Sequence, residues 1–401
     1  MKICFLVTEH SFLDVRIFKK EARSLAKKGF EITIIVPKVS GRLFNIDGKK
    51  ITNNFGDSIF MHEGIKFVTY KKVNLSTNLA KLKQNIISHT HKSFSDPLTR
   101  LGVAEKADVY HAHEYFSLYS GVGIKRILKE RKVKLIYDSH ELDPDPYITN
   151  SKTKNIMIEM LKGMLKEVDY IITVSESIKS WYQDLNSSIP IEVIYNSPPL
   201  TPSYNEHYYP DNDKNDILIV HEGIIDDKRG NPQKMFEIID ICNKEINLTF
   251  RIIGGTKEGE KERLKIPPHL VNHIELIGWV DYHNIPQSIS GANLGWIDLQ
   301  PAKFLNHQFA MPNKFFSYLN NGVPVLVNKC KDMEDFINEY QCGHVVNKID
   351  AKADDYASAI ISLSKNPHYL KKMSINARKI MEKQYSWNKM EKILFDIYDS
   401  F

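Results

Sequence analysis

The strongest indication of a fold in this chain is the segment Pro312-Asn313-Lys314-Phe315-Phe316-Ser317-Tyr318-Leu319-Asn320-Asn321-Gly322-Val323-Pro324-Val325-Leu326-Val327. Pro312 suits the start of a helix, where its missing N–H costs nothing. Gly322 ends the helix, Pro324 prevents its continuation, and a buried strand begins at Val325. A helix followed at once by an apolar strand is typical of a parallel sheet with crossover helices.

The first turn of this helix is suited to an anion. Asn313 and Lys314 lie where free backbone N–H groups and the helix dipole favour negative charge. In open α/β folds, ligands bind at the carboxyl edge of the sheet. The segment therefore predicts a phosphate site, although an ordinary capped helix fits this single motif equally well.

Length and composition bound the class of protein. The 401 residues are too many for one core and predict about two domains. Hydrophobic residues make up 42% and charged residues 26%, as in a globular protein. The four cysteines form no CxxC pair and no cluster with histidine, so neither a disulfide framework nor a zinc site is predicted. With no signal peptide and no run of roughly 20 apolar residues, a cytoplasmic protein is expected.

The charge differs between the two halves. Residues 1–200 hold 30 Lys and Arg against 22 Asp and Glu, a balance of +8, whereas residues 201–401 hold 24 against 27, a balance of −3. A basic half suits an anionic partner such as a phospholipid surface or a phosphorylated lipid. Solvated lysines on helix faces explain the same numbers.

Apolar β-rich runs alternate with helical patterns twice along the chain. The first series spans residues 1–200 and the second spans residues 217–380. Between them, residues 201–216 are poor in apolar residues and predict a linker. Residues 39–63 are rich in Gly, Asn and Asp and predict a mobile loop. Residues 381–401 predict a last amphipathic helix, and a ligand cleft is expected between the two domains.

A series of short motifs runs along nearly the whole chain. Those of the first half are Asp14-x-Arg16-Ile17-Phe18-x-Lys20-Glu21-Ala22, Ala107-Asp108-Val109-Tyr110-His111-Ala112-His113, Tyr137-Asp138-Ser139-His140-Glu141, Asp169-Tyr170-Ile171-Ile172-Thr173-Val174-Ser175-Glu176 and Val193-Ile194-Tyr195-Asn196. Those of the second half are Glu222-Gly223, Lys228-Arg229-Gly230, Ile252-Ile253-Gly254-Gly255, Ile277-Gly278-Trp279-Val280, the Pro-Asn-Lys helix and Tyr385-Ser386-Trp387. Each is weak alone. In this order and spacing, they resemble the retaining glycosyltransferases of family 4.

The resemblance implies the GT-B fold, in which two Rossmann-like domains face each other across a cleft. Residues 1–200 would bind the acceptor, residues 217–380 would bind a nucleotide-sugar, and the helix of residues 381–401 would cross back to the first domain. The implied donor is a UDP-sugar, with a GDP-sugar second. The implied acceptor is a lipid-linked sugar or a polysaccharide of the cell envelope, at the inner face of the membrane. No metal, cofactor or nucleic acid is implied.

On the donor side, the negative charge that develops on the leaving diphosphate needs fixed donors and cations. The family has a cation at the place of Arg229, and Lys314 is the second candidate; a surface turn residue is the alternative for Arg229. Besides Arg229 and Lys314, the resemblance implies that His140 is a catalytic residue that contacts the donor sugar. The alternative is a histidine with a structural role in the core. The other implied donor-side residues are Gly223, Lys228, Gly254, Gly255, Trp279, Asn313, Phe315 and Ser317. Structural roles fit equally well. Gly254 and Gly255 would then form a tight turn at the end of a strand, and Trp279 would lie in the core.

On the acceptor side, candidate residues follow the first strands of the sheet. They are His10, Asp14, Arg16, His113, Glu114 and Glu141. The loop after the first strand departs from the family, which has a glycine pair where this chain has Glu9-His10-Ser11. Structural roles fit these positions as well.

Two further departures bear on activity. Ser317 stands where most of the family has a glutamate that grips the ribose, and Ile224 stands where many relatives have an arginine. Weakened donor binding, a ribose contact from elsewhere and a catalytically degenerate adaptor are three open explanations. A sugar-nucleotide epimerase that uses Glu114 and Glu141 is a further alternative. If only the ribose contact is missing, Ser317→Glu is expected to tighten nucleotide binding.

The motifs of three other enzyme classes are absent from the sequence. No Gly-x-Gly-x-x-Gly follows the first strand, no phosphate loop with Gly-Lys-Ser/Thr occurs, and no nucleophile elbow is present. Gly121-Val122-Gly123 lacks a third glycine and predicts a tight helix start instead. Dehydrogenase and nucleoside-triphosphatase activities are therefore disfavoured.

Overall fold

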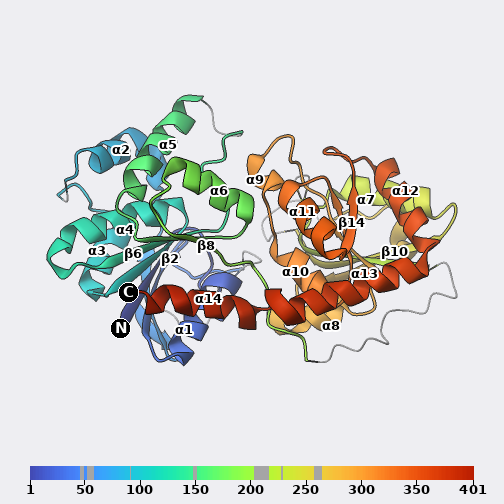
Figure 1. Cartoon of the computed structure of the whole chain (residues 1–401), viewed down its shortest axis with the longest axis horizontal. Helices are drawn as coiled ribbons and strands as arrows, with labels where there is room; N and C mark the ends of the chain where they lie inside the picture. Colours follow the sequence, from blue (N-terminus) through green and yellow to red (C-terminus); the bar gives the residue numbers. More distant parts are fainter. Residues whose placement is uncertain are drawn as a thin grey trace. The chain divides into compact units, whose positions relative to one another are not determined.

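The structure is a computed structural model that describes residues 1–45, 49–51, 58–90, 92–147, 151–202, 216–226, 229–256 and 264–401 (Figure 1). It contains two compact units. The first comprises residues 1–194 together with residues 391–401, and the second comprises residues 195–390. Most of the predicted linker and the middle of the loop predicted over residues 39–63 lie outside the described residues.

The first unit is built on an eight-stranded sheet in the order β3-β4-β2-β1-β5-β6-β7-β8. All neighbours are parallel except the antiparallel pair β3 and β4. The strands are β1 (Lys2–Val7), β2 (Glu31–Lys38), β3 (Ile59–His62), β4 (Ile65–Lys71), β5 (Val109–His113), β6 (Lys134–Ser139), β7 (Tyr170–Thr173) and β8 (Ile191–Val193). Strand β1 therefore lies between β2 and β5, where the order of the chain reverses.

Helices cover both faces of this sheet, with α1 and α14 on one side and α3 and α4 on the other (Figure 1). The helical segments are η1 (Val15–Ala22), α1 (Arg23–Lys27), η2 (Leu75–Asn78), α2 (Leu79–Ile87), α3 (Pro97–Glu105), α4 (Tyr115–Ile127), η3 (Lys129–Arg131), α5 (Ser151–Leu165), α6 (Glu176–Leu185) and, from residue 391 on, α14 (Trp387–Asp399). The end of α14 is held by a 2.7 Å hydrogen bond between Tyr398 Oη and His111 Nδ1.

The second unit contains a six-stranded parallel sheet in the order β11-β10-β9-β12-β13-β14. The strands are β9 (Asp216–Ile224), β10 (Asn247–Gly255), β11 (Ile274–Gly278), β12 (Leu294–Ile297), β13 (Val325–Asn328) and β14 (Gly343–Val346). This is the strand order of a Rossmann fold, with the reversal at β9.

The helical segments of the second unit are α7 (Pro232–Cys242), η5 (Pro268–His273), η6 (Tyr282–Asn284), α8 (Ile285–Ile289), α9 (Leu305–Gln308), α10 (Asn313–Asn320), α11 (Lys331–Tyr340), α12 (Ala353–Ser364), α13 (Pro367–Ile380) and η7 (Met381–Tyr385). Two core layers pack on opposite faces of the sheet. One includes α7 and α12 with Leu326, and the other includes α10 and α11 with the neighbouring Val325 and Val327. Within the described ranges, no helix has both the length and the apolar character needed to cross a membrane.

Local sequence explains where η1 and α10 begin. The Asp14 carboxylate accepts hydrogen bonds from the backbone N–H groups of Arg16 at 2.8 Å and Ile17 at 3.0 Å, so η1 starts there. In the second unit, Pro312 is the N-cap of α10 and Gly322 follows its end with φ +66°. The predicted helix and strand around residues 312–327 are therefore confirmed.

Two strands were missed by the sequence analysis. β3 lies within the predicted loop of residues 39–63, where Ile59 and Met61 alternate outward at the sheet edge and are 55% and 63% exposed. β14 is a four-residue strand, and the helix α11 separates it in the chain from its partner, β13. β14 depends on pairing with a strand that is distant in the chain, whereas β3 pairs with the next strand, β4, across a short turn. Short segments of mixed polarity do not reveal either pairing.

The prediction of a helix start at Gly121-Val122-Gly123 was wrong, because these residues lie inside α4. A Cβ at Gly121 would come within 2.6 Å of Leu135, and one at Gly123 within 2.4 Å of Phe94. The glycines allow close packing of the helix and do not begin it.

Gly254 is packed tightly against the backbone of the paired strand in the second unit and supplies a stability test. It has φ +116°, and a Cβ there would lie 2.3 Å from the Gly223 carbonyl oxygen on the paired strand. We expect Gly254→Ala to lower the free energy of unfolding by about 2–5 kcal/mol, from backbone strain and steric overlap.

Gly291→Ala is the matched control, because Gly291 also has positive φ, at +81°, but has open space around it. It is expected to cost about 1–2 kcal/mol. Thermal and urea unfolding measure both variants, and equal losses would show that the contact between β9 and β10 is not tight.

Candidate functional site

Polar side chains gather at the carboxyl ends of the strands where each sheet reverses its order. In the first unit, these are the ends of β1, β5 and β6, and in the second unit they are the ends of β9 and β10 together with the start of α10. Such reversals are where open α/β sheets bind ligands.

The first unit has a pocket of about 250 Å³ at this edge. Its lining residues are Thr8, Glu9, His10, Glu114, Tyr115, Phe116, His140, Glu141 and Asp143. Burial raises the pKa of Asp143 to about 7, with further contributions from the carboxylates of Glu114, Glu141 and Glu9. The predicted residues His10, Glu114, His140 and Glu141 therefore share one pocket.

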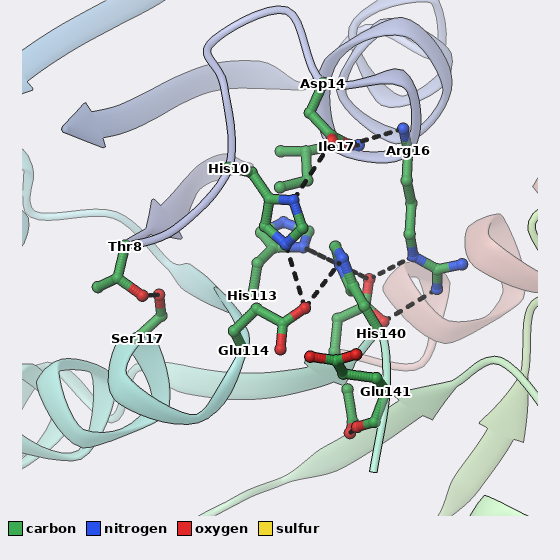
Figure 2. A network of polar contacts seen from close by, with 12 residues as sticks. Thr8, His10, Asp14, Arg16, Ile17, His113, Glu114, Ser117, His140 and Glu141 are labelled. Carbon is green, nitrogen blue, oxygen red and sulfur yellow. Dashed lines mark hydrogen bonds and ion pairs between the residues drawn. The ribbon is translucent and has the colours of Figure 1, made fainter. Parts of the chain in front are cut away.

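At the centre of the pocket, the Glu114 carboxylate lies between two histidines (Figure 2). His10 Nε2 is 3.1 Å and His140 Nδ1 is 3.3 Å from Glu114 Oε1. His10 also reaches Asp14, with Nδ1 3.3 Å from Oδ2. Glu114 has φ +76° and ψ 167°, a conformation that is common only for glycine. Its neighbours hold this side chain in place at the turn between β5 and α4.

Beneath the pocket, Asp138 is the hub of a buried ionic network. The Arg16 guanidinium donates two hydrogen bonds of 2.9 Å to the two oxygens of this carboxylate. His140 Nε2 lies 3.3 Å and His113 Nδ1 3.4 Å from Asp138 Oδ2. Burial alone would raise the pKa of Asp138, but Arg16 and then His140 lower it well below its usual value. The network fixes the ring of His140 from behind.

Two predicted acceptor-side residues lie in this lower network and do not line the pocket. The side chain of Arg16 is 4% exposed and that of His113 is fully buried. Arg16 also donates to the Ile194 carbonyl oxygen at 2.8 Å and lies 3.0 Å from Glu21 Oε1. Their observed contacts are those of positioning residues, since both act on the pocket through Asp138 and His140.

Two groups of side chains in the first unit have the residue types that bind metals. One consists of His10, Glu114 and His140, and the other of Glu21, His111, His113 and Asp138. In the second group, the buried Arg16 already supplies a positive charge. In the first group, the histidine nitrogens are directed to the carboxylates of Asp14, Glu114 and Asp138. The expected independence of metal ions stays a prediction.

In the second unit, Lys314 and Glu222 lie beside Gly223. Gly223 has φ +98°, and a Cβ there would lie 3.8 Å from Lys314 Nζ. Burial lowers the pKa of Lys314, and the carboxylate of Glu222 opposes this shift because it favours the charged ammonium group. Burial raises the pKa of Glu222, and Lys314 and the hydroxyl of Ser317 partly offset this shift by favouring the ionised carboxylate.

The other predicted cation of this unit, Arg229, lies on a turn at the surface. Its side chain is 47% exposed, with Nη2 3.5 Å from Asp226 Oδ2, and its backbone N–H donates to Asp226 Oδ1 at 2.8 Å. The next residue, Gly230, packs over the His221 ring, which a Cβ would meet at 2.2 Å. Lys228 lies outside the described residues.

The remaining donor-side candidates occupy the same edge in different ways. Asn313 is exposed at the start of α10, whereas the Phe315 side chain is buried in the core, so that only the backbone of Phe315 is left for a ligand. Gly254 and Gly255 end β10, and the backbone of Gly254 packs against Gly223. Trp279 is half-buried and donates from Nε1 to the Thr256 carbonyl oxygen at 3.2 Å.

Sequence reasoning overlooked two carboxylates that the structure brings into these sites. Asp138 and Glu222 both stand inside motifs that were quoted, one residue or two before a residue chosen as functional. The available signal was a charged residue at the last positions of a buried strand, where a carboxylate needs a partner.

Known proteins were compared with the chain at the level of sequence and of structure. Residues 16–197, less than half of the chain, match the family model Glycosyltransferase Family 4. No curated protein matches the sequence. Among solved structures, sucrose-phosphate synthase from Thermosynechococcus elongatus superimposes with a TM-score of 0.68 at 12% identity, covering 100% of this chain and 98% of that one.

Two further structures align over the same length. Anabaena HepE in complex with UDP-glucose has a TM-score of 0.64 at 12% identity, with 100% of both chains covered. A glycosyltransferase from Rickettsia africae has a TM-score of 0.63 at 16% identity, covering 100% of this chain and 98% of that one. The chain has the GT-B fold. The predicted fold class, with two Rossmann-like sheets, is thereby confirmed.

The pocket of the first unit predicts a dependence of stability on pH. Burial opposes the charged form of His10, but the carboxylates of Asp14 and Glu114 raise its pKa well above 6.5. A raised pKa contributes stability that is complete below the unfolded value and is lost as pH rises through the folded value. His10→Gln should therefore cost about 1–3 kcal/mol at pH 6, and progressively less as the pH rises.

Hydrogen-exchange protection of β5 in a pH series measures this loss within the first unit. The groups that face His10 are Asp14, Glu114 and His140. His269→Gln is the control, because its side chain is 63% exposed and it should have little effect at any pH. A loss that is independent of pH would contradict a charged His10.

Proposed function

We propose that this protein is a retaining glycosyltransferase that moves a sugar from a UDP-sugar to a lipid-linked or polysaccharide acceptor of the cell envelope. The single observation that carries the proposal is the half-buried Lys314 ammonium group beside the bare backbone of Gly223, at the reversal point of the Rossmann sheet. A fixed cation at a glycine is suited to a diphosphate, because no side chain blocks the approach of the ligand.

In this proposal, the second unit binds the nucleotide. Lys314 and Arg229 stabilise the leaving diphosphate, and the first N–H groups of α10 with Asn313 add hydrogen bonds. These protein cations take the place that a metal ion has in other transferases, so no metal is required. The leaving phosphate can itself deprotonate the acceptor, and no side-chain base is needed.

The first unit supplies the pocket that receives sugar groups. A carboxylate such as that of Glu114 accepts hydrogen bonds from hydroxyl groups, and a histidine such as His140 donates hydrogen bonds to them or accepts hydrogen bonds from them. We assign to His140 the orientation of the donor sugar, since its ring is fixed by Asp138 and lines the pocket. The excess of Lys and Arg in residues 1–200 is the basis for placing the acceptor at an anionic membrane surface inside the cell.

The comparisons support the class of reaction. Residues 16–197 match the Glycosyltransferase Family 4 model, and structural neighbours are HepE with bound UDP-glucose and a trehalose-6-phosphate protein from E. coli with bound UDP-2-fluoro glucose. At 11–12% identity these neighbours share the fold, and their ligands make a uridine nucleotide the first donor to test.

Lys314→Ala and Arg229→Ala test the donor site. Each removes a positive charge from the proposed diphosphate site and should lower the rate of sugar transfer by roughly 10²–10³-fold, as for loss of one charge-stabilising donor. Transfer from a radiolabelled UDP-sugar to a membrane-derived acceptor measures the rate.

Lys331→Ala is the matched control, because Lys331 is 58% exposed and pairs with Asp335 on the surface of α11. Its activity should equal that of the wild type. Circular dichroism checks that all three variants fold, and full activity of Lys314→Ala and Arg229→Ala would refute the assignment.

A catalytically degenerate adaptor is the second candidate, and two observations favour it. Ser317 offers only a hydroxyl on α10, and Ile224 offers an apolar side chain at the end of β9. Thermal unfolding in the presence of UDP, GDP and their sugar conjugates separates the two functions. An enzyme should be stabilised by one nucleotide, by about 2.7 kcal/mol at a concentration of 100 Kd. No stabilisation by any of them favours the adaptor.

A further inference from the structure

Glu222 is an acidic residue whose side chain is not needed to explain the fold of the second unit. It lies two residues before the end of β9, next to Gly223, and is paired in register with Ile253 of β10. Its backbone N–H donates to Tyr318 Oη at 2.7 Å, which ties this end of β9 to α10. The side chain is thereby held at the same edge as Lys314 and Ser317.

The hydrogen bonds of the Glu222 carboxylate are far from complete. Oε1 accepts one long hydrogen bond, of 3.4 Å, from Ser317 Oγ. Oε2 is buried, and none of the described residues donates a hydrogen bond to it. An ionised carboxylate has about four acceptor positions, and leaving them unfilled in a buried place costs free energy. The residue as a whole is only half-buried, and a rotation about its soft terminal torsion exchanges the two oxygens.

The neighbouring charge limits which ligand groups fit. Lys314 attracts anions, and the nucleoside diphosphate of the proposed function carries them on its phosphates. A carboxylate repels phosphate and accepts hydrogen bonds only from donors. The donors of a nucleotide-sugar are its hydroxyls and the N–H groups of its base. Two adjacent hydroxyls match the two oxygens of one carboxylate, whereas a uracil ring offers a single N–H.

We propose that Glu222 is the hydroxyl-binding residue of the donor site, and that it recognises a vicinal diol of the nucleotide-sugar. The inference rests on the proposed function, because it takes the diphosphate to lie at Lys314. Ser317, whose hydroxyl contacts the same carboxylate, orients Glu222. The diol belongs either to the ribose or to the transferred sugar. The two cases differ in which ligand binds more weakly when Glu222 is replaced.

The test compares ligands that differ by one hydroxyl, in calorimetric titrations of wild type and Glu222→Gln. Glutamine keeps the shape and removes the charge. If the diol is that of the ribose, wild type should bind UDP about 10–100-fold more tightly than 2′-deoxy-UDP, and Glu222→Gln should lose most of this ratio. If it is that of the transferred sugar, Glu222→Gln should instead lose the preference for UDP-glucose over UDP.

Glu237→Gln is the matched control, because Glu237 is exposed on α7, where it accepts a hydrogen bond from Gln233 Nε2 at 3.0 Å. It should keep both wild-type ratios. Unchanged ratios in Glu222→Gln overturn the inference and leave the proposed function standing. The same holds for a wild type that prefers neither UDP over 2′-deoxy-UDP nor UDP-glucose over UDP. A wild type that binds no nucleotide overturns both.

The contact with Ser317 adds a second, independent prediction. Ser317→Glu would place a second carboxylate against Glu222, so this variant should bind UDP more weakly than wild type. The same substitution in the Glu222→Gln background should recover at least part of the ratio of affinities that Glu222→Gln loses, because one carboxylate is then present again. Tighter binding by Ser317→Glu alone would contradict a role for Glu222.

Discussion

Both sheets of this protein are covered by helices on both faces, and this constraint determines where polar chemistry is possible. Strands such as β5 and β13 are buried along their whole length. A polar side chain inside such a sheet needs a partner, and the place where one is accessible to a ligand is the carboxyl end of a strand. The functional candidates of both units accordingly lie within a few residues of a strand end.

The two units meet this constraint in different ways. In the first, Asp138 is fully buried and is compensated by Arg16, so its charge holds His140 and His113 in fixed orientations. The pocket above it is thus preorganised. In the second, Glu222 and Lys314 are only half-buried, and each moves the pKa of the other toward its charged form. Both oxygens of Asp138 thus accept hydrogen bonds without a ligand, whereas none of the described residues donates a hydrogen bond to Glu222 Oε2.

This difference changes the interpretation of Ser317. From sequence, Ser317 on α10 stood where most of the family has a glutamate, and this was a reason to doubt nucleotide binding. The structure shows that a carboxylate is present at that place, contributed by β9, and that Ser317 contacts it. The carboxylate that α10 lacks at Ser317 therefore has a counterpart in Glu222 of β9, which a comparison of motifs position by position does not detect.

The sequence by itself determined the number of domains, the α/β class and the helix that begins after Pro312, because these depend on local periodicity and on helix-ending residues. It also named His10, Glu114 and His140, which do share one pocket. Only the tertiary structure decided which residues face that pocket and which, like Arg16, lie beneath it. Strand β14 and the position of Glu222 were decided in the same way, because parallel pairing joins residues that are far apart in the chain.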